Sequence, residues 1–213
     1  MSKIVKKTNP IKFVIFDCDN ILINSDTILI SILLDTIENK GKNLDPDLAI
    51  NYFGGKSLKK CIPILEEICN TKFCESYLEE CLESEINSGL ESNPGVKKFI
   101  NSLQVPYCLV TKLNYDVVIK NLNLTELHPF FKEVQILADI KNSYGTTALQ
   151  ITSSKGFSPF GTLVIKDRPD DLITMEQHGF TMAAITHLPN VETNLNTLFY
   201  EDINELYELV EIG

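Results

Sequence analysis

The sequence predicts an α/β protein: a Rossmann-like, doubly wound parallel sheet that carries an inserted helical domain. Short apolar runs bounded by turn residues alternate with segments of helical spacing. The runs are almost continuously apolar, which is typical of strands buried on both faces. About 65 residues between the first and second runs show helical patterns only. A chain of 213 residues suits a core domain with a smaller insertion.

The expected strands are short apolar runs at 12–17 (KFVIFD), 107–111 (YCLVT), 162–167 (TLVIKD) and 181–186 (TMAAIT), with a weaker one at 133–137 (EVQIL). Helical spacing is expected at about 114–122, 145–154 and 170–178. Strands that alternate with helices imply right-handed crossovers and a parallel sheet covered on both faces.

The stretch from about 26 to 92 is too long for a simple crossover. Its apolar residues recur at helical spacing in four successive segments, and no strand interrupts them. The sequence NPGV at 93–96 ends this block. We therefore predict a core domain made of 1–25 and 93–213, and a helical cap domain at 26–92.

Composition excludes several classes of function. A net charge of −10 and a pI near 4.8 disfavour nucleic acid, whose phosphates the protein's field repels. No apolar run reaches the roughly 18 residues of a membrane span. The basic start, MSKIVKKTNP, is not followed by a signal-peptide core, so a cytoplasmic protein is expected. The six cysteines lack zinc-site spacing and are interpreted as buried thiols.

Polar residues follow three of the expected strands, at the edge where open parallel sheets bind ligands. Carboxylates brought together at that edge repel each other, and a hard divalent cation relieves the repulsion. Magnesium fits, because it takes few carboxylates and keeps sites for water and a substrate phosphate. The residues concerned are Asp17 and Asp19, Thr111 and Lys112, and Lys166, Asp167 and Asp171.

On these residues the chain resembles the haloacid dehalogenase-like (HAD) superfamily, and in particular its helical-capped β-phosphoglucomutase-like and sugar-phosphate phosphatase branch. FDCDNILINSD resembles the family's F-D-x-D-G-x-L-x-D-S-E opening, and NPGVKKFINSL the return from cap to core. YCLVT is similar to the second motif, and VIKDRPDDL with the later HGF to the acidic fourth motif. The resemblance covers about residues 12–187.

The resemblance implies a role for each acid. Asp17 is the expected nucleophile, which takes the phosphoryl group as an aspartyl phosphate. Asp19 is the expected general acid, and then the base that activates water. Thr111 is expected to hydrogen-bond the transferring phosphoryl group. Mg²⁺ is expected on Asp17, Asp167 and the main-chain carbonyl of Asp19, with Asp171 supporting that set.

The segment YFGGKSL at 52–58 resembles the family's cap loop, F-x-G-x-S, which helps to choose the substrate. In this interpretation Gly55 permits the turn and Lys56 meets a second anionic or hydroxylated part of the ligand. The alternative is a Gly-Gly link between cap helices with a solvated lysine.

The chain departs from the family pattern at several positions. Asn20 replaces a glycine, which is tolerable because Asn accepts left-handed backbone angles. Lys112 stands where a small polar residue is usual, and Lys166 replaces an acid or glycine beside the expected metal position.

The third motif, a lysine followed by Pro-x-Pro, is also altered. Alignment without gaps from 139–140 places Tyr144 at the lysine position, whereas Lys141 takes that role if the loop is about three residues shorter. We favour Lys141, since its side chain has a reach of about 6 Å. Lys112 or Lys166 could instead supply the charge from a neighbouring strand end.

The expected function is therefore a Mg²⁺-dependent phosphatase that acts on a small phosphorylated metabolite, with a sugar phosphate as the candidate substrate and a monomer as the default state. Two alternatives remain: a phosphomutase with the same residues, and a degenerate member that binds a phosphorylated ligand or a protein partner without turnover. A dehalogenase is disfavoured, because it needs neither metal nor the second aspartate, and Asp19, Asp167 and Asp171 would have no purpose.

Overall fold

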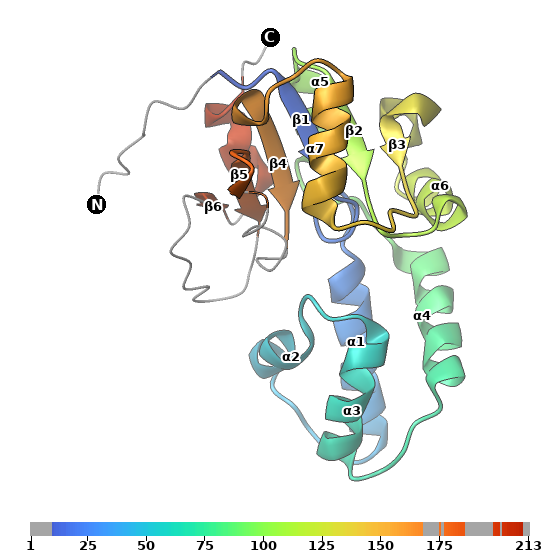
Figure 1. Ribbon diagram of the computed structural model, residues 1–213. Coiled ribbons are helices and arrows are strands. Elements are labelled where there is room, and N and C mark those ends of the chain that lie inside the picture. Colours follow the sequence, from blue (N-terminus) through green and yellow to red (C-terminus); the bar gives the residue numbers. More distant parts are fainter. Residues whose placement is uncertain (1–9, 168–174, 176, 186–197, 201, 211–213) are drawn as a thin grey trace. The chain divides into compact units, whose positions relative to one another are not determined.

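The computed structural model of the protein describes residues 10–167, 175, 177–185, 198–200 and 202–210 (Figure 1). The chain separates into two compact units. The first, called the core unit here, contains the chain up to Ile23 and most of it from Ser92 on. The second, called the helical unit, is Asn24–Glu91. Its bounds lie within two residues of the inserted domain expected at 26–92.

Within the described residues, the core unit contains a six-stranded sheet in which every neighbouring pair is parallel, in the order β3-β2-β1-β4-β5-β6. The strands are β1 (Phe13–Phe16), β2 (Tyr107–Val110), β3 (Ile136–Leu137), β4 (Thr162–Lys166), β5 (Thr181–Ile185) and β6 (Leu198–Tyr200). The strand order reverses at β1, between β2 and β4, which makes the β1–β4 boundary the switch point of a doubly wound sheet. The predicted fold class is confirmed.

Helices of the core unit pack on both faces of this sheet. They are α5 (Val96–Ser102), α6 (Tyr115–Leu124) and α7 (Tyr144–Ser154), with short 3₁₀ helices at His128–Phe130, Glu133–Gln135, Pro159–Gly161 and Ile203–Glu208. α7 crosses one face (Figure 1), where its buried residues join Phe13 and Ile15 in one apolar cluster. On the other face Phe16 meets Phe99 of α5 edge to face, at 6.1 Å between ring centroids.

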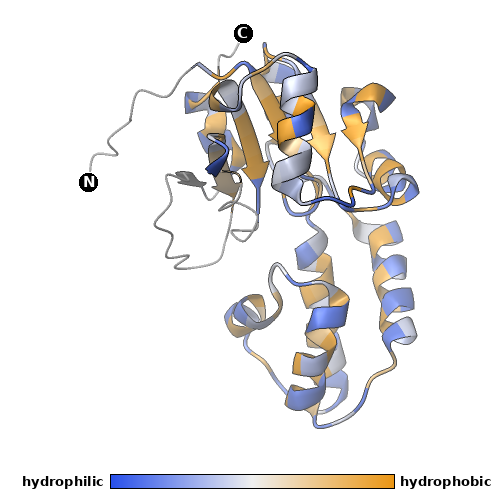
Figure 2. Ribbon diagram, viewed as in Figure 1, coloured by the Kyte–Doolittle hydropathy of each residue, from blue (hydrophilic) through white to orange (hydrophobic). Residues whose placement is uncertain are grey.

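Alternation along the strands explains this division. Successive side chains of a strand point to opposite faces, so Phe13 and Ile15 face α7 while Phe16 faces α5. Both faces are covered, and the strands are accordingly apolar along their length (Figure 2). The same alternation carries Asp17, two residues after Ile15, to the α7 face.

Two expectations about elements need correction. Of the expected strand 133–137, only Ile136–Leu137 pairs with the sheet, and Glu133–Gln135 forms a 3₁₀ turn. β6 and α5 were not expected, and both are short. Most of the helix expected at 170–178 lies outside the described residues.

The helical unit consists of α1 (Ser25–Asn39), α2 (Pro46–Phe53), α3 (Leu58–Cys69) and α4 (Glu75–Gly89). Apolar residues of all four helices form a cluster of their own, including Leu33, Phe53, Leu65 and Leu78. Asp45 begins α2 as its N-cap, accepting the amide of Asp47 at 2.9 Å. A buried cluster within the unit is what a separate domain requires.

The two chain connections of the helical unit run side by side. Ile23 and Ser92 form an isolated antiparallel bridge. One residue further into the unit, the amide of Asn24 donates to the carbonyl of Glu91 at 3.2 Å, and the Asn24 side chain accepts from the Glu91 amide at 3.1 Å. The insertion thus starts and ends at the same place.

All six cysteines are free thiols, as expected from their spacing. Cys18, Cys61, Cys69 and Cys108 are buried and Cys81 is half-buried, but Cys74 is exposed, so the interpretation as buried thiols is wrong for Cys74. Burial raises the pKa of Cys108 to about 12 and that of Cys61 to about 11. Of the helices that the structure describes, none has the length and apolarity to span a membrane.

Candidate active site

The candidate site begins where β1 and β4 end side by side. The register pairs Phe16 with Ile165, and the amide of Asp17 donates to the carbonyl of Ile165 at 3.1 Å. Asp17 and Lys166 are therefore the next residues along two hydrogen-bonded strands. This is the switch point of the sheet, the place where doubly wound folds bind ligands.

Asp17 and Lys166 form an ion pair at this point. Lys166 Nζ donates to Asp17 Oδ2, and the two side chains are 2% and 13% exposed, respectively. Asp17 Oδ1 accepts the amide of Cys18 at 2.8 Å. A charge so deeply buried is tolerated only with a partner of opposite sign, so each group constrains the other.

The ring of Tyr144 packs against the ammonium group of Lys166. The ring is 1% exposed, and Lys166 Nζ lies 3.6 Å from the ring centroid, a close cation–π contact. The hydroxyl donates to the carbonyl of Phe16 at a long 3.4 Å. Tyr144 is the first residue of α7, which Ser143 caps by accepting the amide of Thr146 at 3.2 Å.

The loop after Asp17 is tied to the end of β4 through Asn20. This residue has a φ of 58°, and its side-chain amide donates to Asp167 Oδ2 at 2.7 Å. The glycine expected there would allow the same backbone angle and would leave this hydrogen bond unmade. The replacement therefore links Asp167 to the Asp17–Asn20 loop.

Asn93 also hydrogen-bonds to the loop that follows Asp17. Its side-chain amide donates to the carbonyls of Asn20 and Ile21, at 2.7 and 3.1 Å, and its backbone amide donates to the carbonyl of Leu22 at 2.9 Å. The interpretation from sequence assigned the segment NPGV only to the end of the cap. A turn-forming Asn at a domain return was the available signal.

Thr111 lies at the end of β2, the strand on the other side of β1. Its side chain is buried, and its hydroxyl oxygen accepts the amide of Leu113 at 3.2 Å. Its own amide donates to the carbonyl of Leu137 at 2.9 Å. The hydroxyl hydrogen remains a donor, which agrees with the expected role toward an anion. That role stays a prediction.

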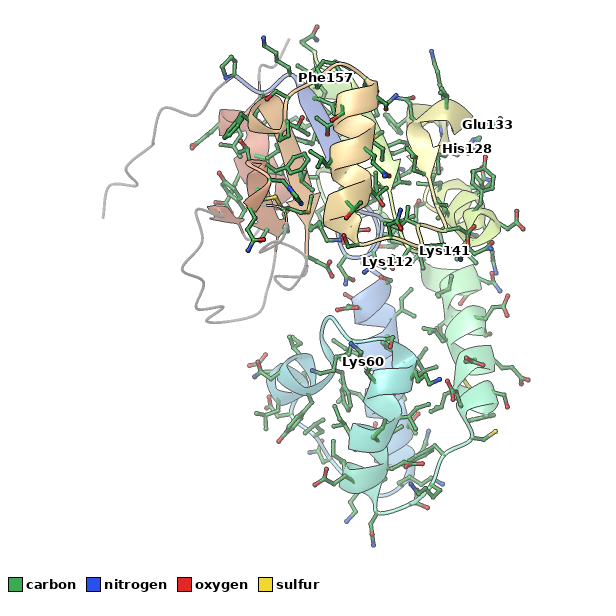
Figure 3. The ribbon with its side chains drawn as sticks, viewed as in Figure 1. Lys60, Lys112, His128, Glu133, Lys141 and Phe157 are labelled. Atoms are coloured by element: carbon green, nitrogen blue, oxygen red, sulfur yellow. The ribbon has the colours of Figure 1, made fainter. Side chains whose placement is uncertain are left out.

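The two other lysines considered for the phosphoryl group, Lys112 and Lys141, lie on the surface. Lys112 and Lys141 follow β2 and β3 at the carboxyl edge of the sheet (Figure 3), and both are exposed. Lys141 is 88% exposed, and its Nζ is 3.9 Å from Asp139 Oδ1. The structure thus brings Lys166, and not Lys141, into contact with Asp17. Lys141 as a catalytic residue and Lys112 as a substrate-binding one stay predictions.

The loop with Gly55 and Lys56 belongs to the helical unit. The amide of Gly55, whose φ is 67°, donates to Asp26 Oδ2 at 2.5 Å, which ties the loop to the first turn of α1. The thiol of Cys61 lies 3.8 Å from the carbonyl of Phe53 and braces the same loop. Lys56 is half-buried. Its role toward a substrate stays a prediction.

The oxygen donors at the switch point fit Mg²⁺. Carboxylates of Asp17 and Asp167, with the main-chain carbonyl of Asp19, would supply the few oxygens that this ion takes when a substrate phosphate adds others. This ligand set stays a prediction. Among the described residues no three His, Cys, Asp or Glu side chains form a ready-made metal cage. Mg²⁺ rarely uses such cages, whereas structural zinc does. Asp171, the fourth expected ligand, lies outside the described residues.

Cys18 is not the nucleophile of this site. Burial raises the pKa of its thiol well above the ordinary value, and the charges of Asp19 and Asp17 raise it further. The thiol therefore stays protonated, and a protonated thiol is a weak nucleophile. The nucleophilic role expected of Asp17 stays a prediction.

The doubly wound parallel sheet, its helical insertion after β1 and the carboxylates at its switch point define an α/β protein of the Rossmann-like class with an acidic ligand edge. Residues 14–185 match the haloacid dehalogenase-like hydrolase family. Because the match spans most of the chain, the protein belongs to that family. The resemblance inferred from the sequence is thereby confirmed, and the protein is a phosphatase- or phosphomutase-like hydrolase.

Individual relatives agree with this. The chain is 24% identical over 206 residues to the "Putative phosphatase YhcW" of Bacillus subtilis (strain 168), covering 93% of this chain and 91% of that one. A HAD family hydrolase from Deinococcus radiodurans R1, solved with bound phosphate and sodium, superposes with a TM-score of 0.71 at 16% identity, covering 89% and 91%. A "putative beta-phosphoglucomutase" from Thermotoga maritima superposes with a TM-score of 0.68 at 19% identity, covering 94% of this chain and 100% of that one.

The Asn20–Asp167 contact leads to a prediction. Asn20→Gly keeps the backbone angle and removes the hydrogen bond, so Mg²⁺ affinity is expected to fall about tenfold to a hundredfold. Isothermal titration with Mg²⁺ measures the change. Asn70→Gly is the matched control, because Asn70 also has a positive φ, 51°, but lies at the end of α3. Unchanged affinity in Asn20→Gly would show that this hydrogen bond does not position Asp167.

Proposed function

We propose that the protein is a Mg²⁺-dependent phosphatase that hydrolyses a small phosphorylated metabolite through an aspartyl phosphate on Asp17. One observation carries the proposal. Asp17 stands at the switch point with its carboxylate oriented by Lys166 and by the Cys18 amide, and the Asn20–Asp167 hydrogen bond draws a second carboxylate to the same loop. An oriented anionic nucleophile beside a second metal ligand suits phosphoryl transfer.

In the first step an oxygen of Asp17 attacks phosphorus and the bond from phosphorus to the ester oxygen breaks. Asp19, in its acid form, gives its proton to the leaving alkoxide, so an alcohol departs and an aspartyl phosphate remains. In the second step the Asp19 carboxylate takes a proton from water as the water attacks phosphorus, and the bond between phosphorus and the Asp17 oxygen breaks. Orthophosphate leaves, and both carboxyl groups return to their initial forms.

Thr111 contributes a hydrogen bond to a phosphoryl oxygen in both steps. Bound Mg²⁺ supplies Lewis-acid charge that offsets the repulsion between an anionic nucleophile and an anionic substrate. Asp17, Asp167 and the Asp19 carbonyl would hold the ion, with Asp171 as the expected supporting residue. The chain's own part is to fix these oxygens on rigid strand ends, since misplaced groups lose most of their effect.

The helical unit acts in this proposal as the cap that selects the substrate, with Gly55 shaping the loop and Lys56 meeting the far end of the ligand. The bond between Asp26 and the Gly55 amide supports a defined loop shape. A sugar phosphate is the substrate class that we propose, in keeping with the name of the Thermotoga maritima neighbour. We also propose a monomer that works in the cytoplasm.

The Asp17–Lys166 ion pair favours a second candidate function. An ammonium on the nucleophile lowers its reactivity, and a protein that binds a phosphorylated ligand without turnover would tolerate this pair well. The two candidates make opposite predictions about phosphate release, so one assay separates them.

The test is phosphate release from a panel of sugar phosphates and other small phosphate monoesters, with Mg²⁺ and with EDTA. We expect turnover of at least one ester with Mg²⁺ and loss of at least about 90% of it in EDTA, because the donor set needs the ion to offset charge. The Asp17→Asn protein, prepared identically, reports any contaminating phosphatase. Absence of Asp17-dependent release across the panel supports the binding protein instead.

A further inference from the structure

Lys166 is an unusual residue at the end of a buried strand. It is the last residue of β4, whose five residues are all buried, and its ammonium group lies against Asp17 at the switch point. Burying an ammonium costs several kcal/mol after relaxation unless a counter-charge offsets it. Such a cost is unnecessary for packing alone, because an apolar residue of similar size would fill the same space.

The partner of Lys166 is the group that changes charge during the proposed reaction. Lys166 donates to Asp17 Oδ2, and the carboxylate of Asp17 is an anion before attack. Once an oxygen of Asp17 is bonded to phosphorus, the side chain is an acyl phosphate, and its carboxyl part carries no charge. The negative charge then resides on the phosphoryl oxygens, within reach of the same ammonium. Lys166 consequently needs the phosphoryl group as its new counter-charge.

Tyr144 prevents Lys166 from turning away from this position. The ammonium lies 3.6 Å from the centroid of a ring that is 1% exposed and fixed at the start of α7. The ring face attracts the cation without competing for an anion, since it offers no negative oxygen. Lys166 is thus held between a π face and the nucleophile, directed at the place where the phosphoryl group arrives.

The other lysines near the edge are arranged differently. Lys141 is 88% exposed and lies near Asp139, and Lys112 is also exposed. Exposed lysines are strongly hydrated and contribute little to binding an anion. Among the described residues, Lys166 is the lysine that forms an ion pair with Asp17.

From this geometry we propose that Lys166 is the residue that binds the transferring phosphoryl group, with Tyr144 as its positioning residue. In the family this role belongs to the third-motif lysine at the start of a helix. Here Lys166, at the end of β4, supplies the positive charge instead. Tyr144, the first residue of α7, occupies the position that alignment without gaps gives to that lysine. The proposal deepens the proposed function and rests on it for the turnover step. Binding of phosphate by Lys166 can be tested without turnover.

The experiment measures binding of inorganic phosphate to the full chain by isothermal titration, with Mg²⁺ and again with EDTA. Lys166→Met is expected to weaken binding at least about tenfold, because a charge-assisted hydrogen bond to the anion is lost. Lys166→Arg keeps the charge and is expected to retain more affinity than Lys166→Met. Lys166→Gln is a second neutral variant, used if Lys166→Met fails to fold as judged by circular dichroism.

Lys155→Met is the matched control. Lys155 is exposed and follows the last residue of α7, about 16 Å along the helix from Tyr144. Its replacement is expected to change phosphate affinity less than about twofold, as for surface charges in general. Lys141→Met tests the competing assignment, because the sequence favours Lys141 as the lysine that binds the phosphoryl group.

The role of Tyr144 needs a readout that packing alone does not move. Tyr144→Phe keeps the ring face and is expected to bind phosphate within about twofold of wild type. Tyr144→Leu removes the face and is expected to weaken binding about fivefold, in keeping with the energy of a desolvated cation–π contact. Equal affinity in the two variants overturns the positioning role.

The outcomes separate failure of this inference from failure of the proposed function. Phosphate binding that depends on Lys166, without turnover of any ester, retains the inference and rejects the phosphatase. Asp17-dependent turnover, with phosphate binding unchanged in Lys166→Met, overturns the inference and retains the phosphatase. Loss of binding in Lys141→Met alone, or no phosphate binding by the wild-type protein, also overturns it.

Discussion

Asp17→Asn is expected to reduce phosphate release by at least about a thousandfold. The amide of Asn is a poor nucleophile and carries no negative charge, so the aspartyl phosphate cannot form. Removal of a nucleophile in other hydrolases leaves only the catalysis that binding and charge stabilisation supply. Steady-state rates with the best ester of the panel give the ratio. A hydroxylamine-labile phosphoryl label should appear on the wild-type chain and not on the variant.

Two further variants serve as controls for this measurement. Asp17→Ala guards against slow deamidation of Asn back to Asp, which would restore traces of activity. Asp35→Asn is the matched control, since Asp35 is exposed on α1, and its activity is expected within about twofold of wild type. Retention of a tenth of the rate in both Asp17 variants would be incompatible with Asp17 as nucleophile.

The second large effect concerns the stability of the Asp17–Lys166 pair. Asp17→Asn leaves the ammonium of Lys166 buried without its carboxylate, and we expect the free energy of unfolding to fall by about 3 kcal/mol. This is the lower end of the usual range for broken buried pairs, because Asp17 is 13% exposed and water can approach it. Urea unfolding of the apo protein, at constant slope, gives the value.

The double variant Asp17→Asn with Lys166→Met is expected to recover most of that loss. Replacement of a buried pair by uncharged groups of similar volume is often neutral or stabilising, and Met also packs well against an aromatic ring such as that of Tyr144. We expect the double variant within about 1 kcal/mol of wild type. Losses that simply add in the double variant would mean that the two groups do not interact energetically.

A surface ion pair supplies the control for this cycle. Lys97 Nζ lies 2.7 Å from Glu126 Oε2, but both side chains are substantially exposed. Hydration and salt screen such a pair, so Glu126→Gln is expected to leave the urea midpoint unchanged. The contrast between the two pairs isolates the contribution of burial.

Much of the fold follows from local patterns. β1, β2, β4 and β5 coincide with four apolar runs, because strands buried on both faces are largely apolar. β3 and β6 have only two and three residues, too few for periodicity to distinguish a strand from a loop. Their pairing is determined by the neighbouring strands, which no local pattern contains.

The candidate site was predictable in part. Asp17 and Asp167 follow separate buried strands, and together with the helical insertion these acids indicate a ligand edge. The partner of Lys166 could not be read in the same way, since Asp17 is 149 residues away in the chain. The face of Lys166 was nevertheless accessible from alternation. Val164 packs in the α7 cluster, so Lys166, two residues later, turns toward Tyr144.

The hydrogen bonds between Asn24 and Glu91 have a consequence for the kinetics of folding. β1 and β2 are neighbours in the sheet but are separated by about 90 residues, which makes their pairing a remote encounter. When the insertion folds on itself and joins Asn24 to Glu91, the open chain between the two strands shrinks to about a quarter of that length. Two halvings of a loop reduce the entropic cost of closure by about 1 kcal/mol. Early folding of the insertion would therefore accelerate assembly of the sheet into which it is inserted.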